Sequence, residues 1–300
     1  MNVPAPAKIL FIINPASGNN TIDWHQLILE FFKDKPVHTQ LLQLDEACSP
    51  QLIKDTIQSY KPDRIMAVGG DGTVKLAASC LINTQTPLGI IPAGSANGMA
   101  KELGIPADID KALELAMGGV LSEIHLVKIN DELCIHLSDI GFNAFVIKKF
   151  ETGAGRGMWG YLKAAWKVLW QHSKMQVAIK VDGKVIKKMA AMVVVANATR
   201  YGSGALINPE GKLDDDVFEV VIVKKISLAE IYKMMVTHIS YDPAKTELYQ
   251  AKSLHIKSNR RVHFQVDGEY LGKVNEITAS IIPGALKIII PSREDADPAR

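Results

Sequence analysis

Short apolar runs alternate with helix-like segments through the first part of the chain. The runs are typical of buried strands, and the segments between them repeat apolar residues every three or four positions. The predicted strands are Ile9–Ile13, Val37–Leu44, Ile65–Val68 and Leu88–Ile91, and helical patterns follow each of them as far as Met117. Strands joined by helices through short loops predict an α/β domain with a doubly wound parallel sheet over residues 1–121.

After residue 121, single apolar and polar residues alternate, as they do in half-buried antiparallel strands. The predicted strands are Met175–Val181, Ala190–Ala196, Val217–Val223, Ala251–Ile256, Arg261–Val266 and Glu276–Ile282, and helical patterns occur at Trp159–Gln171 and Ser227–His238. We therefore expect a second, β-rich sandwich domain over residues 122–292. Its last predicted strand, Leu286–Ile290, is compatible with packing on either domain.

Composition narrows the possibilities mainly by exclusion. The chain is 47% hydrophobic and 22% charged, which is typical of a globular protein, and its net charge of +2 gives no reason to expect a nucleic-acid partner. Cys48, Cys80 and Cys134 are too far apart for a disulfide framework or a zinc site. No apolar run approaches the roughly 20 residues that span a bilayer. These features predict a soluble, cytoplasmic protein.

Turn-forming residues follow three of the predicted strands, at Asn14–Gly18, Gly69–Thr73 and Pro92–Asn97. The carboxyl ends of strands in an open parallel sheet meet at one edge, so these loops would form a single rim. Glycines and helix N-termini there would accept phosphate, and Asp71 is suited to face a magnesium ion or the reacting group. The alternative is three ordinary turns, with Asp71 as a helix cap.

These three motifs, in this order, resemble the diacylglycerol kinase catalytic family, which includes soluble bacterial lipid kinases, sphingosine kinases and ceramide kinase. The resemblance continues through Ile140–Ala144, Asp214–Asp216 and Asp267-Gly268-Glu269, so it covers nearly the whole chain. It implies a first domain similar to those of 6-phosphofructokinases and NAD kinases. It also implies ATP-dependent transfer of the γ-phosphate to a hydroxyl of a lipid such as diacylglycerol or a sphingoid-like alcohol.

The resemblance implies an ATP site in an interdomain cleft. Its residues would be Asn14, Ser17, Gly18, Thr39, Gly69, Gly70, Asp71, Gly72, Thr73, Val74, Lys75, Gly94, Ser95 and Asn97. Asp267 and Glu269 match a motif in which a carboxylate accepts the proton of the substrate hydroxyl, and Asp71 joins them as a catalytic candidate. The alternative for Asp267-Gly268 is a hairpin turn like the one predicted at Asp182-Gly183, although a turn can also present a base.

A structural magnesium ion is implied at residues 212–217. The carboxylate of Asp215 and the backbone carbonyls of Lys212 and Val217 would bind it, since hard oxygen ligands suit magnesium. The alternative is a solvated acidic loop. The aromatic and basic segment Trp159–Trp170 has two interpretations as well, a surface that meets anionic membrane or part of the core.

The chain also departs from the usual motifs of this family. Asn19 replaces a lysine, Lys75-Leu76 replaces Asn-Glu, Gly98 replaces an aspartate, Lys101 replaces an arginine and Asp216 replaces a glycine. Loss of two carboxylates near the nucleotide leaves open a non-catalytic relative that binds ATP or lipid. An NAD kinase-like enzyme with a soluble substrate is the other alternative, because NAD kinases share the Gly69–Thr73 motif. For the kinase we expect ATP, Mg²⁺, a lipid alcohol and transient contact with a membrane surface. The sequence sets no oligomeric state, so a homodimer stays open.

Overall fold

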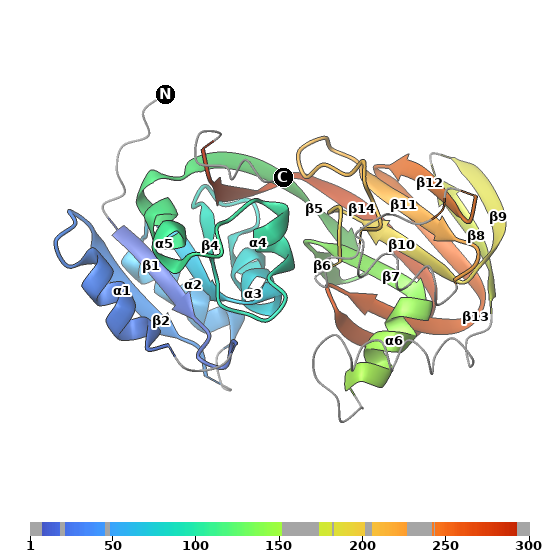
Figure 1. The fold of residues 1–300 in the computed structure, drawn as a ribbon. Helices are drawn as coiled ribbons and strands as arrows, with labels where there is room; N and C mark the ends of the chain where they lie inside the picture. Colours follow the sequence, from blue (N-terminus) through green and yellow to red (C-terminus); the bar gives the residue numbers. More distant parts are fainter. Residues whose placement is uncertain are drawn as a thin grey trace. The chain divides into compact units, whose positions relative to one another are not determined.

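The structure, a computed structural model, describes residues 8–18, 22–45, 49–151, 174–181, 183–201, 206–226, 242 and 244–292. The chain divides into two compact units. Unit 1 comprises Met1–Ile124 and Gly284–Arg300, and unit 2 comprises His125–Pro283 (Figure 1). Strands β5 (Val120–Ile129) and β14 (Glu269–Ile290) each contribute residues to both units. The boundary therefore falls after Ile124 instead of residue 121, and the end of β14 belongs to unit 1.

Unit 1 is built on a parallel sheet. Its strands lie in the order β2-β1-β3-β4, and the C-terminal end of β14 pairs in parallel with β4. The strands are β1 (Lys8–Ile13), β2 (His38–Gln43), β3 (Arg64–Gly69) and β4 (Leu88–Pro92). The central strands β1, β3 and β4 are buried almost throughout, which explains why their sequences are continuous apolar runs.

Helices cover both faces of this sheet. They are α1 (Trp24–Phe32), α2 (Pro50–Tyr60), α3 (Asp71–Leu81), α4 (Gly98–Glu102) and α5 (Ile109–Gly118). α1 packs against α5 and α2 packs against α3, on opposite faces of the sheet (Figure 1). Side chains of Asp23, Ser49 and Asp108 accept hydrogen bonds from the first turns of α1, α2 and α5, so these helices begin where the sequence supplies a cap. The predicted doubly wound α/β domain is confirmed.

Unit 2 is an antiparallel β structure with one large core. Its strands are β6 (Glu132–Cys134), β7 (Leu137–Gly141), β8 (Met175–Val181), β9 (Lys184–Ala190), β10 (Met192–Ala196), β11 (Phe218–Val223), β12 (Thr246–Ala251) and β13 (Ser253–Val266). β13 pairs with β8 through residues 254–258 and with β7 through residues 264–266, and its register with β14 is irregular between Lys257 and Val262. Side chains from β8, β10, β11 and β13 share one hydrophobic core, as predicted for a sandwich.

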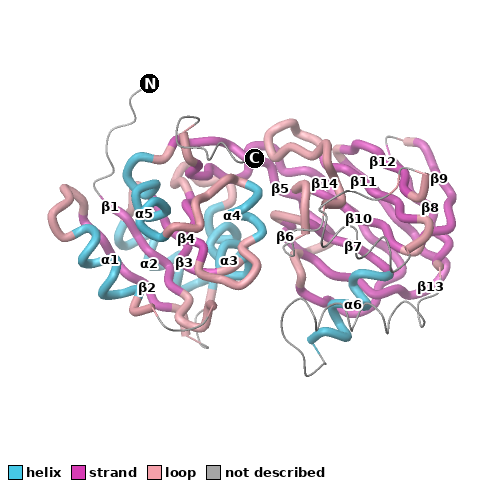
Figure 2. Tube along the Cα trace, in the orientation of Figure 1, coloured by secondary structure: helices cyan, strands magenta, loops and turns pink. Residues whose placement is uncertain are grey.

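Several elements of unit 2 differ from the sequence prediction (Figure 2). β5, β6, β7 and helix α6 (Phe142–Glu151) were not predicted, and the two strands predicted at 251–256 and 261–266 belong largely to one long strand, β13. β7 is wholly buried although it contains Ser138 and Asp139, so its sequence shows neither an apolar run nor alternation. The helices predicted at 159–171 and 227–238 lie outside the described residues. Within the described ranges, no helix combines the length and apolarity that crossing a bilayer requires.

Candidate functional site

Three loops of unit 1 meet at the carboxyl ends of β1, β3 and β4. The side-chain amide of Asn14 donates through Nδ2 to Thr73 Oγ1 at 3.1 Å, which joins the first loop to the second. The second and third loops approach so closely that a Cβ built on Gly94 would lie 2.5 Å from the Cα of Gly70. The three loops therefore lie together at one edge of the sheet, as predicted.

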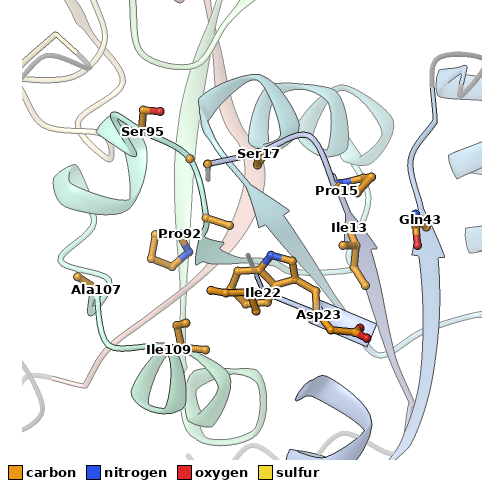
Figure 3. Close-up of a pocket in the computed structure, with 14 residues that line it drawn as sticks. Ile13, Pro15, Ser17, Ile22, Asp23, Gln43, Pro92, Ser95, Ala107 and Ile109 are labelled. Atoms are coloured by element: carbon orange, nitrogen blue, oxygen red, sulfur yellow. The ribbon is translucent and has the colours of Figure 1, made fainter. Parts of the chain in front are cut away.

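A cavity of about 690 Å³ opens beside these loops (Figure 3). Figure 3 shows Pro92, Ala107 and Ile109 on one side of it and Ile13 and Gln43 on the other. Four of the predicted ATP residues line this cavity, namely Ser17, Gly18, Gly94 and Ser95. Pro15, Pro92 and Ala93, from the predicted loops, line it as well. Sequence reasoning missed the lining residues outside these loops, which include Ile22, Asp23, Trp24, Gln43, Ala107 and Ile109. Its volume is in the usual range for a small-molecule site.

Thr39 is not among the residues that the structure brings to this edge. In the parallel register of β1 and β2, Thr39 pairs with Ile9 and Gln43 pairs with Ile13. Thr39 therefore lies four residues, or about 13 Å, from the carboxyl end of its strand. Gln43 ends that strand and lines the cavity, so the placement of Thr39 in the ATP site is corrected in favour of Gln43.

The remaining predicted ATP residues support the loops without lining the cavity. Gly69 ends β3, Gly70 precedes α3, and residues 71–75 form the start of α3, whose first amides point out of the helix end. Asn97 shapes the third loop, because its side chain accepts from the Gly94 amide at 2.9 Å and donates to the Gly94 carbonyl at 2.8 Å.

Asp71 acts as a cap for a neighbouring helix. Its two carboxylate oxygens accept hydrogen bonds from the backbone amides of Gly98 and Met99, each at 2.9 Å. Those amides begin α4, whose own N-cap residue Asn97 makes no side-chain capping bond. A carboxylate at a helix N-terminus satisfies free amides and meets the positive end of the helix dipole. The capping alternative for Asp71 is therefore realised, across two loops instead of within one.

In unit 2, Asp267 and Gly268 form the two-residue turn between β13 and β14. Their φ angles are 51° and 87°, which is the left-handed pair of a type I′ hairpin. The Asp267 carboxylate accepts hydrogen bonds from three successive backbone amides, those of Ile135 at 3.2 Å, His136 at 2.9 Å and Leu137 at 3.2 Å. The turn alternative is realised, and the turn holds a fixed carboxylate. Glu269 is the first residue of β14 and is exposed.

A buried carboxylate lies beneath this turn. Asp139 is 1% exposed, and it accepts hydrogen bonds from Asn143 Nδ2 at 2.7 Å and from Gln265 Nε2 at 2.6 Å. Gln265 also accepts from the backbone amide of Gly268 at 2.7 Å, so it links Asp139 to the turn. Sequence reasoning missed Asp139; its signal was an acidic residue directly before the Ile140–Ala144 motif.

Burial raises the pKa of Asp139 from 3.8 to about 6, against the opposing effect of its hydrogen-bond donors. A pKa that is higher in the folded state favours folding at low pH, and this contribution is lost as pH rises from about 4 to about 6. We expect the free energy of unfolding of the wild type to fall across this window by about 3 kcal/mol relative to that of Asp139→Asn. Urea unfolding at a series of pH values measures this difference. Parallel pH profiles for the two proteins would contradict the expectation.

Both halves of the chain match known families. Residues 8–129 match the diacylglycerol kinase catalytic domain, and residues 139–290 match the YegS C-terminal NAD kinase beta sandwich-like domain. The chain belongs to the diacylglycerol kinase catalytic family. Membership places it among the kinases, as the motifs predicted.

Relatives of the family align with most of this chain. The diacylglycerol kinase of Bacillus subtilis (strain 168) is 29% identical over 277 residues, which are 89% of this chain and 90% of that protein. An uncharacterized protein of Synechocystis sp. is 28% identical over 239 residues, which are 76% of this chain but only 54% of that longer relative.

Solved structures confirm the fold class. A diacylglycerol kinase from Bacillus anthracis str. Sterne has a TM-score of 0.73 at 22% identity, with 98% of each chain covered. An NAD kinase from Archaeoglobus fulgidus, solved in complex with ATP, has a TM-score of 0.53 at 14% identity and covers 95% of this chain and 94% of its own. At these identities the likeness concerns the fold alone.

One departure from the family motifs lies beside Asp71. Gly98 stands where the bacterial members carry an aspartate, and its amide donates to Asp71. This bond needs only the backbone at position 98, so glycine still provides a donor to Asp71. Lys75 and Leu76 lie in α3, and the structure offers no account of why they replace Asn-Glu.

The loop predicted to hold a structural magnesium ion has a mixed fit. Asp214, Asp215 and Asp216 are exposed, and Asp215 accepts a hydrogen bond from the Val217 amide at 3.4 Å. Asp216 has a φ of 57°, the left-handed conformation that suits the glycine usual in the family. Among the described residues, no three His, Cys, Asp or Glu side chains converge as metal ligands. The ion at Lys212, Asp215 and Val217 stays a prediction.

Proposed function

We propose that this protein is a kinase that transfers the γ-phosphoryl group of ATP, with Mg²⁺, to a hydroxyl of a membrane lipid. The observation that carries the proposal is the convergence of the three glycine-containing loops beside one cavity, in a chain that matches both domains of the family. Phosphoryl transfer asks a protein mainly for positioning and for stabilisation of charge, and such a rim supplies both.

The phosphate end of the reaction belongs to unit 1. Amides at the start of α3, beginning after Gly70, carry the positive end of a helix dipole and suit the phosphate oxygens. Asp71 positions the third loop by capping α4, which keeps Gly94 and Ser95 at the cavity. The adenine and ribose would occupy the part of the cavity lined by Ile22, Trp24 and Gln43.

The acceptor end of the reaction belongs to unit 2. Asp267 would accept the proton of the lipid hydroxyl as its oxygen attacks the γ-phosphorus and the bond to the β-phosphate oxygen breaks. The three amides that bind Asp267 fix the orientation of its carboxylate, which a general base needs. Glu269, exposed two residues further on, would assist in binding the hydroxyl or its proton.

Magnesium enters the proposal as the counterion of ATP. Bound there, it would neutralise charge on the transferring phosphate groups. Asp71 is the carboxylate within the three loops, and each of its oxygens already accepts one backbone hydrogen bond. A carboxylate oxygen can accept more than one partner, so Asp71 fits a role in holding the hydrated ion as well as its role as a cap.

The substrate we propose is a lipid alcohol, with diacylglycerol or a sphingoid-like alcohol as the first candidates. The protein would be cytoplasmic, where ATP is available, and would contact a membrane surface during turnover. The Trp159–Trp170 segment predicted for that contact lies outside the described residues. A homodimer stays a prediction.

Transfer of labelled γ-phosphate from ATP into a total lipid extract tests this function. We expect a labelled phospholipid in the presence of Mg²⁺, none after chelation, and an identity for the acceptor from the isolated product. NAD offered in parallel tests the NAD kinase alternative. Label in NAD and not in lipid would contradict the proposal.

A non-catalytic role is the second candidate, and one observation favours it. The carboxylates of Asp71 and Asp267 both accept hydrogen bonds from backbone amides. Each residue therefore has a structural role that does not depend on catalysis. ATP binding by calorimetry combined with no turnover on any lipid would support this second candidate.

A further inference from the structure

One face of the sheet in unit 2 combines exposed apolar and cationic side chains. β9 lies at the edge of its sheet in the described structure and pairs with β8 (Figure 1). Val185 and Met189 on β9 are 60% and 52% exposed, the two highest values among the large hydrophobic residues of the described chain. Lys187 lies between them and is also exposed. Two apolar side chains flank a cation along one strand.

Strand register shows that these three residues share a face with further lysines. Lys180 on β8 is directly opposite Val185, and Ala178 is opposite Lys187. On the next strand, β13, Lys257 is opposite Ala178. Directly opposed residues of antiparallel strands point to the same face, so Lys180, Lys187 and Lys257 lie with Val185 and Met189. We call these five residues the β8–β9 face.

Opposing negative charge is scarce there. Among the described residues that these registers place on the same side, Glu276 on β14 is the acidic one, opposite Lys257. Glu276 is hydrogen bonded to His255. The three lysines thus give this face a net positive charge although the whole chain carries only +2.

Two ordinary explanations account for only part of this pattern. Lysines on an edge strand prevent pairing with other chains, but such protection gives no reason to expose Val185 and Met189. A second copy of the chain docked on this face would cover the apolar side chains, but it would bring the lysines of the two copies together. An anionic lipid surface satisfies both properties, because headgroups pair with lysines and the interface accepts apolar side chains.

We propose that the β8–β9 face docks the protein on a membrane surface rich in anionic phospholipid. Lys180, Lys187 and Lys257 would contact phosphate headgroups while Val185 and Met189 enter the interfacial layer. This inference rests on the proposed function, since a kinase that acts on a membrane lipid must reach the membrane surface. It assigns that recruitment to residues of the sandwich that are distinct from the proposed ATP and base residues.

Co-sedimentation with vesicles tests this surface. We expect the full chain to bind vesicles of phosphatidylglycerol and phosphatidylcholine, to bind pure phosphatidylcholine weakly, and to be released by salt. Lys180→Gln/Lys187→Gln/Lys257→Gln should weaken binding by about 100-fold, from about fivefold per lysine. Val185→Ser/Met189→Ser should weaken it by about tenfold. The matched control is Lys33→Gln/Lys54→Gln/Lys111→Gln, which removes three exposed lysines of unit 1 and should bind as the wild type does.

Two further measurements separate this proposal from the proposed function. Phosphoryl transfer to lipid in neutral detergent micelles should be unchanged in the triple lysine variant, because such micelles carry no anionic headgroups. If the wild type shows no activity in micelles but binds anionic vesicles, the proposed kinase function is contradicted and the docking surface is retained. Sedimentation velocity reports self-association. The docking proposal would be overturned if the triple lysine variant and the control bound vesicles equally well. It would also be overturned if substitutions in the β8–β9 face changed dimerisation and left vesicle binding unchanged.

Discussion

Asp267→Asn is expected to lower kcat for phosphoryl transfer by a factor of about 10²–10⁴, the usual worth of a general base. Asparagine keeps the shape of the side chain but cannot take the proton of the attacking hydroxyl. The measurement is steady-state turnover on the lipid acceptor identified from the total extract. Because the variant keeps the groups that bind ATP and lipid, KM should change much less than kcat.

The same substitution should also reduce stability. One oxygen of Asp267 accepts from Ile135, and the other accepts from His136 and Leu137. An amide group offers only one oxygen, so at least one of these backbone donors loses its partner, at a cost of about 1–3 kcal/mol. Asp131→Asn is the matched control, since it makes the same chemical change at an exposed position of unit 2 and should be neutral for unfolding. If Asp267→Asn loses stability but keeps full activity, Asp267 is a structural residue and the base must be found elsewhere.

Gly94→Ala is expected to disrupt the proposed nucleotide site by forcing two of its loops apart. The added Cβ would lie 2.5 Å from the Cα of Gly70 and 2.9 Å from Asn97 Oδ1, and the backbone atom cannot turn away. The second and third loops must separate, which costs about 1–3 kcal/mol in unfolding free energy. Displacement of the phosphate-binding amides by about 1 Å should reduce kcat/KM for ATP by about 100-fold.

Gly72→Ala provides the control for backbone effects. No atom lies within 4 Å of a Cβ built on Gly72, which is the second residue of α3. Alanine in a helix should hold or raise stability, by up to about 1 kcal/mol. Urea unfolding compares the two variants, and calorimetry with MgATP compares Gly94→Ala with the wild type. Wild-type stability and wild-type ATP affinity in Gly94→Ala would show that close approach of these loops is not required.

Unit 1 could be read from the sequence because its pattern is local. Strands buried on both faces, such as Ile9–Ile13 and Ile65–Val68, are continuous apolar runs, and helices begin at residues that can cap them. The loops at their carboxyl ends then fall on one edge by topology alone. Thr39 was assigned from the family resemblance and not from this pattern, and the register with β1 places it near the start of its strand, away from that edge.

Unit 2 was less predictable, because long-range pairing decides what its residues do. Asp139 and Gln265 are 126 positions apart and meet only when β7 and β13 pair. The partners of the Asp267 carboxylate come from a segment 130 or more residues earlier in the chain, so no local pattern could reveal them. β7 escaped prediction for the same reason, since its polar residues are buried by distant partners.

The sequence by itself determined the α/β and β-sandwich halves, the three loops that face one edge, and the family. Hydrophobic periodicity and turn residues depend on a few neighbouring positions, so they can be recognised in the sequence alone. Only the tertiary structure decided that Asp71 caps α4, that Gln43 replaces Thr39 at the cavity, and that Asp139 supports the Asp267 turn. These depend on hydrogen bonds and registers between segments distant in sequence, which form only when the chain has folded.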